Sequence, residues 1–145
     1  RTGTEHTMFT IIVTPRFCDT DLLGHVNNTA LPAWFEQARL PFFTLFCADV
    51  ATASRSNFPL VLAHLDIDFR HEIRLGTDVE VRTLVSRLGT SSFTVHQEAW
   101  QSGELCAEGN VVLVHFDHVQ RESRPLPPPL RARLEAWMTT APITP

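Results

Sequence analysis

The chain has 145 residues, of which 43% are hydrophobic and 19% are charged, and its formal net charge is −4 at neutral pH. This length and composition fit one globular domain with a single hydrophobic core. The acidic balance argues against nucleic acid as a partner, because nucleic-acid binding favours a basic surface. No apolar run approaches the ~18 residues that a membrane-spanning helix needs, so we expect no membrane span.

The cysteines and histidines offer no pattern that is typical of a metal site. Three cysteines, Cys18, Cys47 and Cys106, are widely spaced, and an odd, unpatterned count indicates neither a disulfide framework nor a zinc site. The later histidines are scattered over several predicted strands and loops, without close ligand spacing. We therefore expect a reduced, cytoplasmic protein that holds no metal ion.

The first third of the chain predicts a strand and then a buried helix. Residues 1–7 are polar and expected to be loose, whereas the run Phe9–Phe17 begins with β-branched residues and predicts a strand. The run Thr29–Cys47 has apolar residues around nearly its whole circumference, which predicts a buried helix. Pro41 is expected to kink this helix or to end a first section of it.

The rest of the chain predicts consecutive strands and a short last helix. After a small, polar loop over 48–59, alternation or a long apolar run marks four strands: 65–70, 79–84, 93–98 and 105–116. Turn residues between them predict hairpins and an antiparallel sheet. The segment 119–145 is expected to be a linker with a proline-rich spacer and a C-terminal helix over 130–138. This order predicts one α+β domain over 1–145, in which a helix packs on an antiparallel sheet.

The segment Asp19–Asn28 joins the first strand to the long helix and is the most informative part of the chain. It places two carboxylates, a glycine, a histidine and two asparagines within ten residues. A helix start offers free backbone N–H groups and the positive end of the helix dipole. A carboxylate beside such donors is the arrangement that acyl transfer needs.

The pattern Asp19-x-Asp21-x-x-Gly24-His25-Val26-Asn27-Asn28, with Trp34-Phe35-Glu36-Gln37-Ala38-Arg39 after it, resembles the hotdog-fold acyl-CoA thioesterases of the 4-hydroxybenzoyl-CoA thioesterase type. The segments 66–79 and 89–93 are similar to that family as well, and the resemblance covers residues 9–118. It implies a hotdog fold, in which an antiparallel five-stranded sheet wraps around a long central helix. It also implies a homodimer, often paired into a homotetramer as a dimer of dimers, with active sites at the dimer interface.

The substrate that the resemblance implies is an acyl-CoA thioester, so coenzyme A is part of the substrate and no separate cofactor is expected. Asp21 would be the catalytic carboxylate, acting either as a general base on water or as the direct nucleophile. The backbone amides of Asn27 and Asn28 are candidate donors to the thioester carbonyl. Gly24 permits a turn with positive φ and a close approach of the substrate.

His25 is a second candidate acid or base, since an imidazole titrates near neutral pH. Further candidates for substrate binding lie on the helix and on the hairpin between the third and fourth strands: Leu31, Trp34, Phe35, Glu36, Arg87, Thr90 and Ser91. The Leu31 position shapes the acyl pocket in the family, and Trp34 and Phe35 belong either to the core or to that pocket. Arg87 is a candidate for the phosphates of coenzyme A.

Two other functions fit the same residues. A hotdog hydratase or dehydratase acting on an acyl thioester would use a histidine with a carboxylate, which His25 and Glu36 would supply. A non-catalytic module would bind the acyl thioester and release no thiol.

Overall fold

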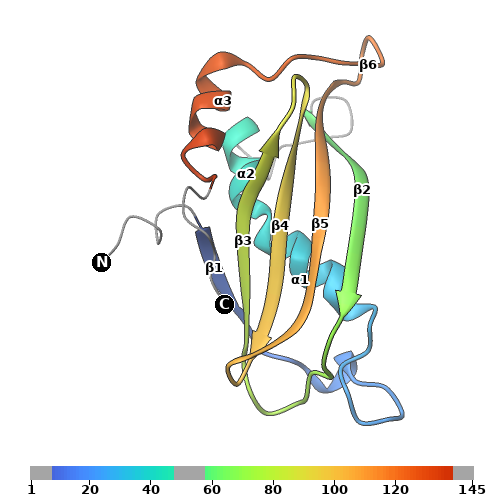
Figure 1. The fold of residues 1–145 in the computed structure, drawn as a ribbon. Helices are drawn as coiled ribbons and strands as arrows, with labels where there is room; N and C mark the ends of the chain where they lie inside the picture. Colours follow the sequence, from blue (N-terminus) through green and yellow to red (C-terminus); the bar gives the residue numbers. More distant parts are fainter. Residues whose placement is uncertain (1–7, 48–57, 139–145) are drawn as a thin grey trace.

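The computed structural model describes residues 8–47 and 58–138, so the predicted loose N-terminus and most of the predicted loop over 48–59 lie outside the described residues. Its centre is one antiparallel sheet, in which the strands lie in the order β1-β3-β4-β5-β2 (Figure 1). The strands span these residues: β1 Met8–Val13, β2 Leu60–Phe69, β3 Val79–Leu88, β4 Ser92–Gln101 and β5 Glu104–Asp117. The short strand β6 (Glu122–Ser123) pairs with the end of β5.

The predicted α+β class and the antiparallel hairpins are confirmed. All four strands expected after the helix are present. The last three extend beyond their predicted ranges, whereas β2 begins earlier than predicted and ends at Phe69. The first strand is shorter than predicted, because β1 ends at Val13 and Phe17–Asp19 forms a 3₁₀ turn.

The prediction of one long central helix is wrong. The segment forms two short helices, α1 (Ala30–Ala38) and α2 (Leu40–Phe46), which are separated at Arg39. Pro41 has no N–H to donate to the carbonyl four residues earlier, and its ring clashes with that carbonyl. The backbone responds at Arg39, with φ −89° and ψ 0°, and the Arg39 amide donates to Glu36 O at 3.0 Å.

Hydrogen bonds of a buried polar side chain link the break between α1 and α2 to the sheet. Gln97 of β4 is fully buried, and its Nε2 donates to Phe35 O at 3.0 Å and to Thr83 Oγ1 at 2.9 Å. Its Oε1 accepts from Arg39 Nη1 at 3.2 Å. Burial lowers the pKa of Arg39, and its Nε has no partner among the described residues. Gln97 therefore satisfies groups that the broken helix leaves inside the protein.

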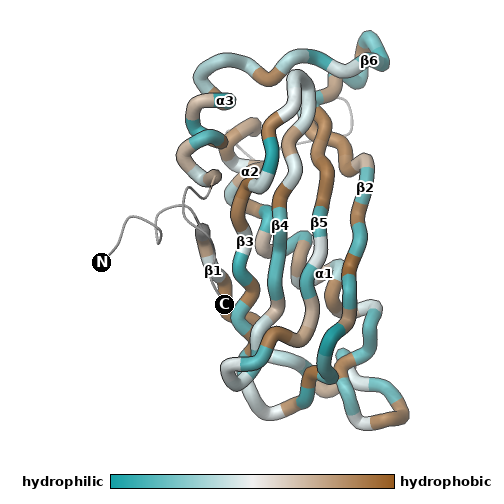
Figure 2. Tube along the Cα trace, viewed as in Figure 1, coloured by the Kyte–Doolittle hydropathy of each residue, from teal (hydrophilic) through white to brown (hydrophobic). Residues whose placement is uncertain are grey.

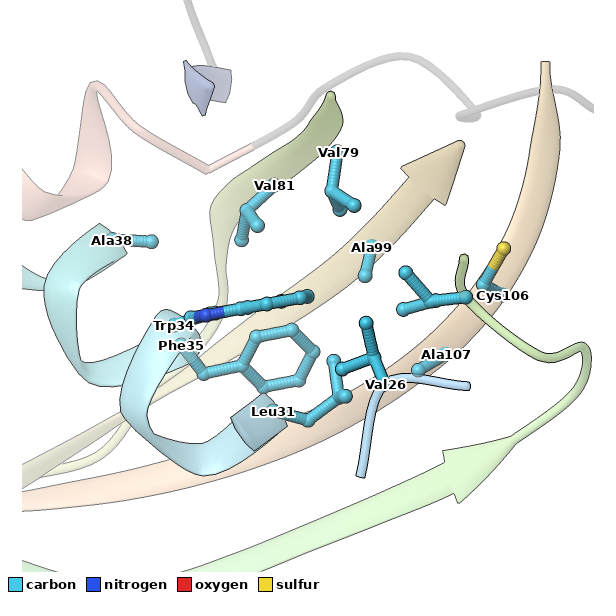
Figure 3. Packing of buried hydrophobic residues seen from close by; sticks show 11 residues of the cluster. Val26, Leu31, Trp34, Phe35, Ala38, Val79, Val81, Ala99, Cys106 and Ala107 are labelled. Atoms are coloured by element: carbon cyan, nitrogen blue, oxygen red, sulfur yellow. The ribbon is translucent and has the colours of Figure 1, made fainter. Parts of the chain in front are cut away.

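The helices bury the inner face of the sheet in two clusters. Around α1, Trp34 and Phe35 pack with Val79, Val81 and Ala99 (Figure 3). Around α2, the second cluster centres on Phe42 and Phe93, and the last helix, α3 (Pro128–Glu135), adds the fully buried Leu134.

The opposite face of the sheet carries no helix in the described part of the chain (Figure 1). The residues in the middle of β4 are hydrophilic (Figure 2). None of the helices within residues 8–47 and 58–138 is long and apolar enough to cross a membrane.

Candidate active site

Asp21 lies in a tight turn that backbone hydrogen bonds close. The Gly24 amide donates to Asp21 O, and the Asp21 amide donates to His25 O, both at 3.0 Å. Gly24 has φ +81°, a conformation that glycine adopts without steric cost, so its role here is conformational. The Asp21 Oδ1 atom accepts from the Leu23 amide at 2.9 Å. Its Oδ2 accepts no hydrogen bond from the described residues, so one oxygen of this exposed carboxylate has no protein partner among them.

Asn27 forms a hydrogen-bonded turn just before the start of α1. Its Oδ1 accepts from the amide of Thr29 at 2.9 Å and from the Thr29 hydroxyl at 2.8 Å. The carbonyl oxygens of Asn27 and Asn28 accept the first helical amides, those of Ala30 and Leu31. Within residues 8–47 and 58–138 the amide of Asn28 itself donates to no protein group. An unengaged amide at a helix start is a ready donor to an oxygen that carries partial negative charge.

The partner of His25 is Glu72, which follows the end of β2. His25 Nε2 lies 2.6 Å from Glu72 Oε2, and backbone pairing of His25 with Arg74 keeps the two segments together. Glu72 also binds Arg74 at 2.6 Å. This hydrogen bond with Arg74, more than the charge of His25, holds the pKa of Glu72 below its usual value. In this chain His25 bonds to Glu72 and not to Glu36, which is exposed on α1 and does not line the cavity described below.

These groups line one cavity of about 380 Å³, which is formed by the Asp21 turn, the start of α1, the residues around the end of β2 and the first part of β5. Its lining residues are Asp21, His25, Val26, Asn28, Leu31, Phe69, Arg70, His71, Glu72, Ile73 and Cys106. The fold therefore brings Asp21, His25, Asn28 and Leu31 together as the sequence predicted. Gly24 and Asn27 shape the turns beside the cavity without lining it.

Several lining residues were not predicted from the sequence. Glu72 and His71 directly follow the Asp66–Arg70 segment, but nothing in their spacing relates them to His25. Cys106 is a buried thiol whose Sγ lies 3.4 Å from Glu104 O, and burial raises its pKa above the usual value. A thiol in this environment stays protonated and is a poor nucleophile. Cys18 is exposed and lies outside the cavity lining.

Other predicted binding residues lie elsewhere in the chain. Trp34 and Phe35 are 7% and 0% exposed and belong to the core rather than to the cavity (Figure 3). Three more, Arg87, Thr90 and Ser91, belong to the β3–β4 turn region. This turn lies at the opposite end of the sheet from the Asp21 segment (Figure 1). Within one chain they cannot contact a ligand in the cavity.

Comparison with known proteins finds thioesterases among the proteins that this chain resembles. The family model of the thioesterase-like superfamily matches residues 15–134. The 1,4-dihydroxy-2-naphthoyl-CoA hydrolase of Synechococcus sp. (strain CC9605) is 30% identical over 129 residues, which cover 85% of this chain and 87% of the relative.

Two solved structures are similar over most of their length. One is a predicted thioesterase from Bacillus stearothermophilus, with 35% identity and a TM-score of 0.86, covering 92% of this chain and 98% of that one. The other is a thioesterase from Thermus thermophilus complexed with coenzyme A and Zn. It has 32% identity and a TM-score of 0.75, covering 86% of this chain and 95% of that one.

Proposed function

The chain belongs to the thioesterase-like superfamily and is a thioester hydrolase, and we propose that it cleaves acyl-CoA thioesters with Asp21 as the catalytic carboxylate. The observation that carries this assignment is that Asp21, which has one oxygen without a protein partner, and Asn28, whose amide is unengaged, line the same cavity. One group activates the attacking oxygen and the other polarises the carbonyl, and these are the two functions that thioester hydrolysis requires.

In the general-base route, Asp21 takes a proton from water while the water oxygen attacks the thioester carbon. The developing oxyanion accepts a hydrogen bond from the Asn28 amide, which typically stabilises such a transition state by about 3 kcal/mol. The C–S bond then breaks, and the thiolate of coenzyme A leaves and takes up a proton. In the alternative route Asp21 attacks the thioester carbon and displaces the thiolate of coenzyme A, which takes up a proton, and water later hydrolyses the resulting anhydride to the acid and the free carboxylate.

The acyl group would extend over the apolar part of the cavity. Leu31, Val26 and Ile73 line this part and are nearly fully buried. Arg70 also lines the cavity, and its guanidinium suits the phosphates of coenzyme A. The substrate named for the Synechococcus relative, 1,4-dihydroxy-2-naphthoyl-CoA, makes an aromatic acyl group the first one to test.

We further propose that the active unit is a homodimer joined through β2. This strand is an edge of the sheet, and Leu62 and Phe69 on it are 45% and 54% exposed. Edge strands present unpaired backbone groups that a second strand can satisfy. Antiparallel pairing of two β2 strands would place the partner's β3–β4 turn at the end of this chain's cavity. Arg87, Thr90 and Ser91 would then reach the substrate from the partner, and two such dimers would form the expected tetramer.

The His25–Glu72 pair favours a second candidate function, hydration or dehydration of an acyl thioester. A histidine held by a carboxylate is a suitable general acid and base. The two functions differ in products, so an acyl-CoA panel that includes an α,β-unsaturated ester separates them. A thioesterase releases free coenzyme A from saturated and aromatic esters, whereas a hydratase adds water to the double bond and releases no thiol. Binding without either product would support a non-catalytic module.

A further inference from the structure

The helix-free face of the sheet carries a cluster of one histidine and two glutamates. His96 and Glu98 alternate along β4 with the buried Val95, Gln97 and Ala99, so they point to the opposite face. Glu108 of β5 lies directly opposite Glu98 in the strand register. His96 Nε2 is 3.2 Å from Glu98 Oε2 and 3.5 Å from Glu108 Oε1.

Each carboxylate of this cluster is oriented by a hydrogen bond through its other oxygen. The Trp100 indole Nε1 donates to Glu98 Oε1 at 2.8 Å. The Arg70 guanidinium donates to Glu108 Oε2, with Nε at 3.2 Å. The remaining oxygens, Glu98 Oε2 and Glu108 Oε1, therefore face His96 without further reorganisation.

The His96 imidazole is also held by a hydrogen bond at the ring nitrogen that faces away from the two carboxylates. Asn110 Nδ2 donates to Asp66 Oδ1 at 3.2 Å, which leaves Asn110 Oδ1 as an acceptor 3.2 Å from His96 Nδ1. His96 Nδ1 must then carry a hydrogen, and Nε2 points at the two carboxylates. Histidines that bind metal ions are typically held in this way, with the far ring nitrogen donating to a fixed acceptor.

Two carboxylates directly opposite each other on neighbouring strands repel unless a cation lies between them. A proton on His96 Nε2 supplies one positive charge. A divalent ion in place of that proton would neutralise both carboxylates.

The spacing suits a tetrahedral ion. Ligand atoms that lie ~2.1 Å from Zn²⁺ at tetrahedral angles are about 3.4 Å apart, and the nitrogen–oxygen distances here are 3.2 and 3.5 Å. All three ligand atoms lie within 4.8 Å of one another. We infer that His96 Nε2, Glu98 Oε2 and Glu108 Oε1 bind a divalent transition-metal ion of the Zn²⁺ type. Solvent would supply the fourth ligand, since the side chains of His96 and Glu108 are 23% and 25% exposed.

This site is separate from the hydrolytic cavity, although Arg70 contributes to both. It clamps β4 to β5 on the face that no described helix covers, so its role is to stabilise the sheet. Loss of the ion is therefore expected to lower the melting temperature and to leave thiol release measurable.

The test is titration of the chelator-treated protein with ZnCl₂ by calorimetry, with Co²⁺ absorption as a second readout of tetrahedral binding. We expect one equivalent per chain in the wild type and its loss in His96→Gln and Glu98→Gln. His118→Gln, which alters a half-buried histidine outside the cluster, is the matched control and should bind as the wild type does. Trp100→Phe keeps all three ligands but frees Glu98, and should weaken binding about 10–100-fold.

Circular dichroism and melting curves establish that each variant is folded before it is titrated. A folded wild type that takes up no Zn²⁺ would overturn the inference, and the cluster would then be an imidazolium held by two carboxylates. Unchanged binding in His96→Gln would overturn it equally, because the ion would then lie elsewhere.

Discussion

His25 Nε2 lies 2.6 Å from Glu72 Oε2, so the histidine of the acidic motif is held by a glutamate 47 residues later in the chain. Glu72 is itself bound by Arg74. The result is a small hydrogen-bonded network that fixes the loop after β2 against the turn that carries Asp21. In our account this pair positions the turn, whereas Asp21 performs the chemistry.

The first prediction follows from that division of roles. Glu72→Gln keeps the size of the side chain but removes the charge that holds His25, and we expect thiol release to fall by less than about tenfold. A lost general acid or base typically costs 10²–10⁴-fold, so His25→Gln separates the two interpretations in the same assay. A loss of that larger size in His25→Gln would make His25 the catalyst.

The second prediction concerns the backbone amide of Asn28. Asn28→Pro removes this N–H near a helix start, where proline is tolerated, and we expect kcat to fall about 10²–10³-fold. Asn28→Ala keeps the amide and should remain close to the wild type, which makes it the matched control. Equal activity of the two variants, at equal melting temperature, would exclude the amide as the carbonyl donor.

The third prediction concerns stability. Gln97→Leu removes the groups that satisfy Phe35 O, Thr83 Oγ1 and Arg39 Nη1 inside the core. Buried polar groups left without partners are expensive, so we expect the free energy of unfolding to fall by about 3 kcal/mol. Urea unfolding measures this difference. Gln37→Leu, on the exposed side of α1, should change it by less than about 0.5 kcal/mol, and a similar loss in both variants would contradict the role of the buried network.

The fourth prediction concerns the dependence of stability on pH. The Arg16 side chain and backbone amide donate to the Asp19 carboxylate and hold its pKa below the usual 3.8. A carboxyl whose folded-state pKa is lowered contributes stability above its unfolded pKa, and this contribution disappears as the pH falls through the folded-state pKa.

Asp19→Asn should therefore be less stable than the wild type at neutral pH, and the two proteins should converge as the pH falls below about 3.8. Urea unfolding at several pH values measures this convergence. A difference that stays constant with pH would show that Asp19 stabilises the fold without its charge.

The strands were predictable because one face of each is buried. Apolar residues alternate with polar ones along β2, at Leu65 and Ile67, and along β3, at Val79 and Val81. A short stretch of sequence is enough to show this period of two. The helix was harder to predict, because apolar residues around its whole circumference indicate that it is buried but not whether it is continuous. Pro41 indicated a break, but Gln97, which binds the Arg39 side chain at that break, is distant in sequence.

The candidate site was predicted where its residues are local and missed where they are not. Asp21 and Asn28 lie on either side of one short turn, so a sequence motif contains their relationship. Glu72 reaches His25 only through the pairing of the two loops, and His96 reaches Glu108 only through the register of β4 and β5. Neither relationship has a fixed spacing that a motif could record.

The most direct test of the account is thiol release from a panel of acyl-CoA esters by the wild type and by Asp21→Asn. Asp78→Asn serves as the control, because it neutralises an exposed carboxylate outside the cavity. We predict turnover by the wild type and by Asp78→Asn, and a loss of at least about 10²-fold in Asp21→Asn at an unchanged melting temperature. Equal turnover by all three proteins would contradict the assignment of Asp21 as the catalytic carboxylate.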